Sequence, residues 1–231
     1  MSRRASRADW AQASVDLSRR NAVAARLFAT HGPPDLPPVP KRSERFRSLA
    51  SSITAQQVSG KAAESIFQRV VNLVGDDFSP QRVLDLGPET LRTAGLSGSK
   101  AISVVDLATH CVDGSVRLED MGRMDDDDVI DMLVQVRGIG VWTAQMVLLF
   151  DLRRLDVWPT GDLGVRVGFG RAFELETSPT PSELLEMGEQ FAPYRSVMAW
   201  WSWRSTGPPT ESTSRRAQRQ APTSQPSQDD D

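Results

Sequence analysis

Apolar residues recur every three or four positions along most of the chain, which is the spacing of a helix with one buried face. In the stretch FRSLASSITAQQVSGKAAESIFQRVV the apolar positions are Phe46, Leu49, Ile53, Ala62, Ile66 and Val70. The pair Ser59-Gly60 interrupts this stripe. The pattern therefore predicts two amphipathic helices rather than one long helix.

A Ser or Pro start, an apolar stripe and a glycine end recur further along the chain. The segments SPQRVLDL, PETLRTAG and SGSKAISVVDLATHCVDG follow this pattern. Further helices are predicted over residues 8–30, 125–136, 141–150, 162–173, 181–191 and 194–204. Because no stretch combines sustained strand alternation with hairpin turns, the sequence predicts an all-α protein.

Two segments do not fit a helix. The Pro-rich PPDLPPVP at residues 33–40 cannot be helical and separates the N-terminal helix from the rest. Residues 205–231 contain hardly any apolar side chains, so burial cannot repay the entropy of ordering them. We expect this C-terminal segment to be a disordered tail.

The scarcity of cysteine and histidine excludes several kinds of chemistry. Cys111 is the one cysteine of the sequence, which rules out an intramolecular disulfide, a four-cysteine zinc site and a cysteine-ligated iron–sulfur cluster. The histidines are His31, expected to end a helix, and His110, too few for a His-rich metal site. No apolar run is long enough to span a bilayer or act as a signal segment, so we expect a cytoplasmic protein without a membrane partner.

Charge is unevenly distributed, although the net charge is −3. Residues 1–50 hold ten Lys and Arg against four acids, a surplus of six positive charges. The acids gather at residues 125–128, where they suit the positive end of a helix, and at residues 229–231. Charge alone leaves open both a nucleic-acid face and solvated surfaces without a partner.

The segment LVQVRGIGVWTA places Gly138 and Gly140 around Ile139, between two predicted helices. Glycines let a backbone approach an anion closely, and the following helix N-terminus carries positive partial charge. A DNA phosphate is such an anion. On these residues alone, a tight turn between two helices without a ligand is the favoured interpretation.

Downstream, LDVWPTGDLGVR places Asp162 at the predicted start of a helix, after a loop rich in Pro and Gly. An aspartate in this position is ordinarily an N-cap. Five segments along residues 45–204 are, in this order, SSITAQQVSGKAA, LRTAGLSGSKA, VRGIGVWTAQM, DVWPTGDLGVR and YRSVMAWWSWR. Through these segments the chain resembles the helix-hairpin-helix DNA glycosylases, and among them the alkyladenine (3-methyladenine II) branch.

The resemblance implies roles for individual residues. Asp162 matches the catalytic aspartate. The hairpin of Gly138, Ile139 and Gly140 would grip a phosphate, with Thr143 and the wedge position Gln57 as further DNA contacts. The base pocket would include Trp142, Met146 and Trp203, and the backbone carbonyls of Val134, Val136 and Ile139 would hold a monovalent cation, Na⁺ or K⁺. No other cofactor is expected.

Several of these residues have simpler interpretations. Gln57 is polar where some relatives have an apolar wedge, so the identity of the wedge stays open. At least one of Trp200, Trp201 and Trp203 is expected in the core, and Trp142 suits a core as well as a pocket. Lys100 suits a solvated helix start better than a phosphate contact.

Trp142 occupies the position at which the lyase branches of the superfamily carry a nucleophilic lysine, so no Schiff base can form there. The resemblance therefore implies a monofunctional glycosylase that removes alkylated purines of the 3-methyladenine and 7-methylguanine type from duplex DNA, leaving an abasic site. An alkylated purine is already cationic and leaves as a neutral base, so Asp162 needs only to stabilise the sugar cation or orient water. The alternatives are a glycosylase for deaminated or oxidised bases, and a helix-hairpin-helix protein that binds lesions without cleaving.

The expected architecture has two helical lobes around a DNA-binding cleft. Residues 1–44 are expected to pack with residues 162–204, and residues 45–161 to form the central lobe. We expect a monomer in the bacterial cytoplasm, associated with the nucleoid.

Overall fold

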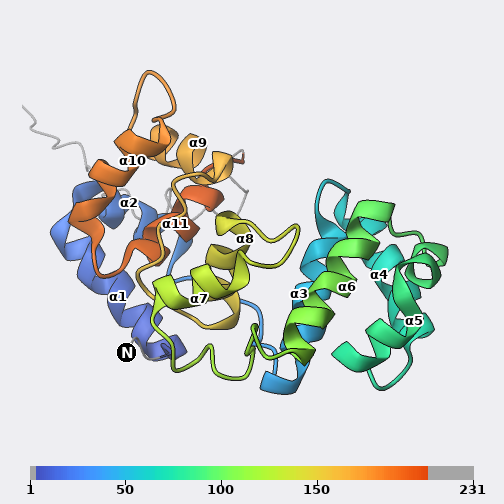
Figure 1. Cartoon of the computed structure of the whole chain (residues 1–231). Coiled ribbons are helices and arrows are strands. Elements are labelled where there is room, and N and C mark those ends of the chain that lie inside the picture. The colour runs from blue at the N-terminus through green and yellow to red at the C-terminus, as the bar shows by residue number, and fades with distance from the viewer. Residues whose placement is uncertain (1–3, 208–231) are drawn as a thin grey trace, which may run out of the picture. The chain divides into compact units, whose positions relative to one another are not determined.

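The computed structural model describes residues 4–207, and in this part of the chain all regular structure is helical (Figure 1). The prediction of an all-α protein is confirmed. The described residues form two compact units. Unit 1 comprises residues 4–6 and 36–157, and unit 2 comprises residues 7–35 and 158–207.

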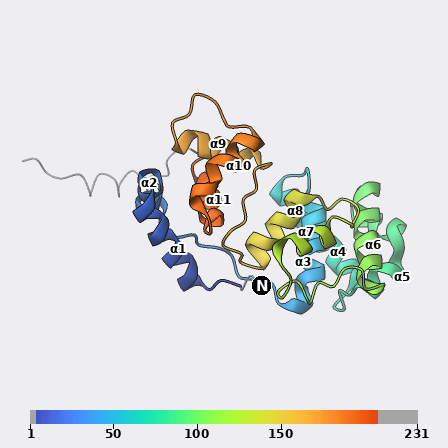
Figure 2. The same ribbon diagram turned by 60° about the vertical axis from the view of Figure 1, so that its left-hand side comes forward.

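Unit 1 contains six α-helices and a short 3-10 turn, η1 (Arg42–Glu44). The helices are α3 (Arg45–Ala55), α4 (Gly60–Val74), α5 (Pro80–Thr93), α6 (Gly98–Val112), α7 (Asp126–Leu133) and α8 (Val141–Met146). Helices α3, α4, α5 and α6 lie together in both views (Figures 1 and 2). Their apolar stripes, with Leu49, Leu91 and Leu107 among the fully buried side chains, form the core of this unit.

The predicted helix starts of unit 1 are confirmed. Ser59, Ser79 and Ser97 each accept a hydrogen bond from the backbone N–H three residues later, at the starts of α4, α5 and α6. The two predicted segments around residue 87 form one bent element, because Gly87 adopts φ 70° and Pro88 follows it. The predicted break at Ser59-Gly60 separates α3 from α4.

Unit 2 contains α1 (Arg7–Arg20), α2 (Ala22–His31), α9 (Leu163–Ala172), α10 (Pro181–Gly188), the 3-10 turn η3 (Glu189–Phe191) and α11 (Arg195–Arg204). Helix α11 packs against α9, α2 and α1. Trp201 of α11 is fully buried and donates its indole N–H to the carbonyl of Gly32 (2.9 Å). The expectation that one of the three tryptophans of WWSW lies in the core is confirmed.

One predicted helix is wrong. We expected a single helix over residues 8–30, but the chain forms α1 and α2 with a break at Asn21. Asn21 has φ −142° and ψ 128°, and its side chain accepts hydrogen bonds from the N–H groups of Val23 and Ala24. Asparagine competes with the helical backbone for these donors, so it starts a new helix instead of continuing the old one.

Other boundaries differ by a few residues. Helix α7 ends at Leu133 rather than at residue 136, and α8 continues as a π-helical turn, η2 (Val147–Asp151). Residues 36–44 belong to unit 1, although we expected them with the N-terminal helix. Of the predicted tail, residues 205–207 are described, and the backbone N–H groups of Ser205 and Thr206 donate to carbonyls of α11. Residues 208–231 lie outside the described part. Among residues 4–207, no helix is both long and apolar enough to cross a membrane.

Candidate functional site

The hairpin between α7 and α8 is a tight turn built on two glycines of different character. Gly138 adopts φ +81°, a conformation that side chains rarely allow. A Cβ added there would also lie 2.7 Å from the hydroxyl oxygen of Ser103 on α6. At Gly140, by contrast, a Cβ would meet no atom within 4 Å. Gly138 is therefore required by the fold itself, whereas the space beside Gly140 is open.

The carbonyls expected to hold a cation lie in this same turn. The carbonyl of Val136 accepts the N–H of Ile139 (3.0 Å). Outside the regular helices of the described chain, no backbone N–H donates to the carbonyls of Val134 or Ile139. Each carbonyl oxygen has two lone pairs, so all three retain capacity for a ligand. The residues present thus fit the group that the resemblance implies.

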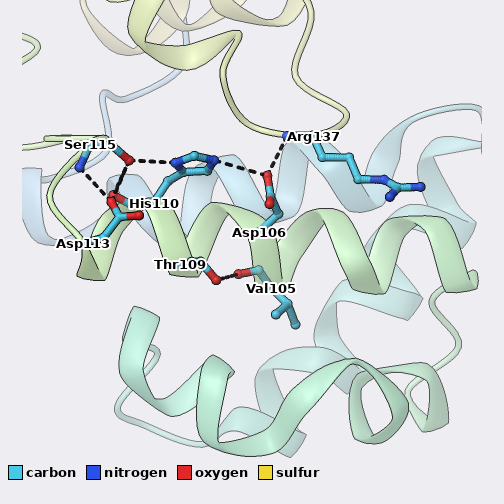
Figure 3. Close-up of polar contacts among 7 residues, drawn as sticks. All are labelled: Val105, Asp106, Thr109, His110, Asp113, Ser115 and Arg137. Carbon is cyan, nitrogen blue, oxygen red and sulfur yellow. Dashed lines mark hydrogen bonds and ion pairs between the residues drawn. The ribbon is translucent and has the colours of Figure 1, made fainter.

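Helix α6 holds the start of the hairpin through Asp106, whose Oδ2 accepts the backbone N–H of Arg137 at 2.7 Å (Figure 3). The same oxygen lies 3.6 Å from Nε2 of His110. The hydroxyl of Ser115 lies 2.6 Å from Asp113 Oδ1 and 2.7 Å from His110 Nδ1. This row of polar groups fixes the histidine that faces Asp106.

Arg137 is a residue that sequence reasoning missed. Its backbone is held by Asp106, while its exposed side chain extends away from that carboxylate (Figure 3). An exposed cation directly before the two glycines suits a phosphate-binding turn. The signal in the sequence is the arginine of VRGIG, directly before the glycines.

Unit 1 also contains the predicted wedge position. Gln57 is exposed and adopts φ 56° in the turn between α3 and α4. Its neighbour Gln56 donates its side-chain amide to the carbonyl of Gly138 (2.8 Å), which connects this turn to the hairpin. Lys100 donates from Nζ to the carbonyl of Thr54 (2.8 Å). Lys100 is therefore not a fully solvated helix-start cation, and since its ammonium group has two further donors, a phosphate contact from it stays a prediction.

The predicted residues of α8 differ in exposure. Trp142 is 48% exposed, so the interpretation of this residue as part of the core is wrong. Thr143 is buried, so a contact from it to DNA would involve its backbone N–H in the first turn of α8. Met146 is half-buried. Their roles in DNA and base binding stay predictions.

In unit 2, Asp162 lies directly before α9, and its carboxylate is held by two donors. Its Oδ1 accepts the backbone N–H of Val165 (2.8 Å) and the indole N–H of Trp203 (2.9 Å). The side chain is half-buried. Asp162 is therefore the N-cap of α9, and this role is compatible with a chemical one because the two contacts fix the plane of the carboxylate.

Two glycines bring Trp203 to Asp162, and sequence reasoning missed both. A Cβ at Gly164 would lie 3.0 Å from Cδ1 of Trp203 and 3.1 Å from Oδ1 of Asp162. A Cβ at Gly168 would lie only 1.7 Å from the carbonyl oxygen of Ser202, so α9 and α11 can approach this closely only at a glycine. Met146 and Trp142 belong to unit 1 and Trp203 to unit 2. A pocket that includes all three stays a prediction.

The basic N-terminal region is partly used within the fold. Arg20 donates to the carbonyl of Ala192, and Arg26 donates to that of Ala172 and pairs with Glu174 (3.4 Å). Arg45 is buried, and its pKa is lowered first by desolvation. Part of the positive surplus in residues 1–50 therefore makes contacts within the protein itself.

A helix-hairpin-helix in one unit, and in the other an aspartate that caps a helix after a Pro/Gly-rich loop, define a class of DNA repair protein. Residues 50–193 match the HhH-GPD superfamily of base excision DNA repair proteins, and the chain belongs to this family. DNA-3-methyladenine glycosylase 1 of Schizosaccharomyces pombe is 32% identical over 169 residues, covering 72% of this chain and 74% of the relative.

Solved structures are similar as well. A 3-methyladenine DNA glycosylase of Schizosaccharomyces pombe in complex with abasic DNA has a TM-score of 0.71 and 29% identity, covering 84% of this chain and 95% of that one. A DNA-3-methyladenine glycosidase of Bacillus halodurans has a TM-score of 0.73 and 33% identity, and the match covers 84% of this chain and 89% of that one.

Proposed function

We propose that the protein is a monofunctional DNA glycosylase that releases alkylated purines of the 3-methyladenine and 7-methylguanine type from duplex DNA. The observation that carries this proposal is the carboxylate of Asp162, oriented by Val165 and Trp203 in a chain whose relatives are named DNA-3-methyladenine glycosylases. A similar structure was solved with abasic DNA, which is the product that such a reaction leaves.

The chemistry follows from the charge of the substrate. An N3- or N7-alkylated purine carries a positive charge, so when the bond from C1′ to the base nitrogen breaks, the electron pair leaves with a neutral base. The sugar becomes an oxocarbenium-like cation, and the carboxylate of Asp162 stabilises it. Water then adds to C1′ and loses one proton to the solvent, which completes an abasic site. This route requires no acid to protonate the base.

Recognition uses the same charge. A cationic base stacked on an indole gains roughly 0.5–2 kcal/mol over a neutral base. Trp142 is exposed on α8, and Trp203 lies at the carboxylate, so each offers an indole for this purpose. An alkylated base also leaves the stack more easily than an intact one.

The hairpin of Gly138, Ile139 and Gly140 contacts a phosphate of the duplex in this proposal, together with Arg137 and the first turn of α8. A monovalent cation, Na⁺ or K⁺, held by the carbonyls of Val134, Val136 and Ile139 would add positive charge beside that phosphate. Replacing Na⁺ and K⁺ by a bulky organic cation at constant ionic strength should then weaken DNA binding. We also propose that the enzyme acts as a monomer on the bacterial nucleoid.

The proposal is tested by a base-release assay on duplexes that each carry one lesion, with the variant Asp162→Asn beside the wild type. Asn caps a helix as well as Asp does, so the fold and lesion binding should persist. Excision should fall by orders of magnitude, because the negative charge beside the sugar is gone. Wild-type rates in Asp162→Asn would leave Asp162 as a cap only. If the wild type releases only deaminated or oxidised bases, its substrate is not an alkylated purine. If it releases no base at all, the protein binds lesions without cleaving them.

A further inference from the structure

The turn between α3 and α4 contains the adjacent residues Gln56 and Gln57, and hydrogen bonds hold the chain on both sides of this pair. Before them, the carbonyl of Thr54 accepts a hydrogen bond from Nζ of Lys100, which fastens the end of α3 to α6. After them, Ser59 caps α4 by accepting the N–H of Ala62. The turn is therefore held by its neighbours, and its own conformation depends on residues 56–58.

Within this turn the two glutamines have different environments. Gln56 is half-buried and donates from Nε2 to the carbonyl of Gly138 at 2.8 Å. Gln57 has an exposed side chain, and its backbone adopts φ 56°. Such a conformation costs energy for a residue with a Cβ and persists only where surrounding contacts impose it. The hydrogen bond of the adjacent Gln56 is such a contact.

The partner of Gln56 lies in a part of the hairpin that α6 holds. Gly138 adopts φ +81° beside Ser103 of α6, and the backbone N–H of the preceding Arg137 donates to Asp106 of the same helix. The hydrogen bond from Gln56 to the Gly138 carbonyl therefore joins the α3–α4 turn directly to the anchored side of the hairpin.

We propose that Gln56 is a positioning residue that sets the place of Gln57 relative to the phosphate-binding hairpin. This inference rests on the proposed function, in which the hairpin holds the backbone of the duplex and Gln57 fills the gap left by the extruded base. With the hairpin seated on a phosphate, the Gln56 bond fixes how far Gln57 reaches into the base stack. Gln56 acts on extrusion of the base, and the bond-breaking step at the sugar does not depend on it.

The test compares single-turnover excision of one alkylated purine in duplex and in single-stranded DNA. Gln56→Ala, and Gln56→Glu, which keeps the length of the side chain but loses the donor, should each slow excision from the duplex about five- to tenfold. Excision from the single strand, which needs no unpairing, should change less than about twofold. Gln68→Ala, which removes an exposed hydrogen bond to Asn72 on α4, is the matched control and should leave both rates unchanged.

A double variant distinguishes positioning from an independent contact. If Gln56 acts through Gln57, the variant Gln56→Ala/Gln57→Ala should be no slower on duplex than Gln57→Ala alone. Additive losses, or an equal loss on single-stranded DNA, would overturn the proposal. The fluorescence of a 2-aminopurine placed next to the lesion reports unstacking of the bases. This fluorescence should rise less when Gln56→Ala binds the duplex than when the wild type binds it.

Hydrogen exchange gives a readout that does not depend on activity. In the free protein, Gln56→Ala should speed exchange at the backbone N–H of residue 56, which donates to the carbonyl of Ile53 (3.4 Å) at the start of the α3–α4 turn. Unchanged exchange at this N–H would overturn the proposal. If the wild type releases no base, the proposed function fails, whereas the exchange measurement still decides whether the Gln56 bond orders the turn that carries Gln57.

Discussion

The carboxylate of Asp162 has two N–H donors on one oxygen, one from the backbone of α9 and one from the indole of Trp203. Hydrogen bonds to a charged group contribute about 1.5–3 kcal/mol each, more than bonds between neutral groups. These contacts hold the carboxylate in one orientation before any substrate arrives. Such preorganisation is what a group that stabilises a developing cation requires.

We expect Trp203→Phe to slow base release about tenfold, because Phe keeps most of the ring and loses the donor. Trp200→Phe on the same helix is the control, since Trp200 contacts Arg204 (5.7 Å from the ring centroid to Cζ) and not the carboxylate. Single-turnover rates at saturating enzyme report the effect, and urea unfolding checks that the fold is intact. Equal rates for the two variants would show that the indole N–H does not matter for the chemistry.

At this scale the sequence predicted Asp162 but not the residues that hold it. The aspartate follows a recognisable loop, PTGD. Its bond to Trp203, by contrast, joins residues 41 positions apart and depends on Gly164 and on the close approach at Gly168. A glycine inside a helix shows no sign of its partner in the sequence, because only the packing of α9 on α11 supplies it.

The helix-hairpin-helix is the element that carries DNA binding in the proposed function, and its two glycines separate folding from binding. Gly138 is needed for the turn, while a Cβ at Gly140 meets only open space. A methyl group at Gly140 can therefore obstruct an incoming phosphate without disturbing the protein.

Gly140→Ala should weaken binding to damaged and undamaged duplex by the same factor, since phosphate contacts carry no information about the base. Its free energy of unfolding should stay within about 1 kcal/mol of wild type. Gly138→Ala should in addition destabilise the protein, because of its positive φ and the contact with Ser103. Fluorescence anisotropy with both duplexes measures the affinities. A loss confined to the damaged duplex would place Gly140 in the base pocket.

The periodicity of apolar residues and the capping residues predicted where helices occur. They did not always predict where each helix begins and ends. Ser59, Ser79 and Ser97 indicate the starts of their helices, because a serine hydroxyl can cap the helix that follows it. Asn21 is hard to identify as a cap because the apolar stripe continues on both sides of it. The π-helical turn after α8 depends on packing and has no signal in the local sequence.

For the molecule as a whole, the distribution of amines decides whether a lyase reaction can accompany base release. The sequence contains only three lysines, Lys41, Lys61 and Lys100. Of these, Lys100 is bound to the carbonyl of Thr54 at the end of α3. The resemblance places Trp142 where the lyase branches carry their nucleophilic lysine, and an indole cannot form a Schiff base.

We therefore expect borohydride to trap no covalent complex with DNA, and strands to stay intact until alkali cleaves the abasic site. Denaturing electrophoresis of the reaction, with and without borohydride, measures both. Trp142→Lys is the matched variant, because it places an amine at the position of the lyase lysine. A covalent complex trapped with this variant would show that the assay detects a Schiff base. Efficient trapping by the wild type would assign the reaction to another lysine or to the N-terminal amine.

Unit 2 is discontinuous in the chain, and this has a consequence for synthesis on the ribosome. The buried side chains of α1 and α2, among them Trp10, Leu17 and Leu27, emerge first. Their partner α11 is made last, and Trp201 follows Gly32, to which it donates a hydrogen bond, by 169 residues. At roughly 5–20 residues per second, the two nascent helices wait on the order of ten seconds or more with their apolar faces uncovered. We therefore expect unit 2 to complete its core after the chain of unit 1 has been made.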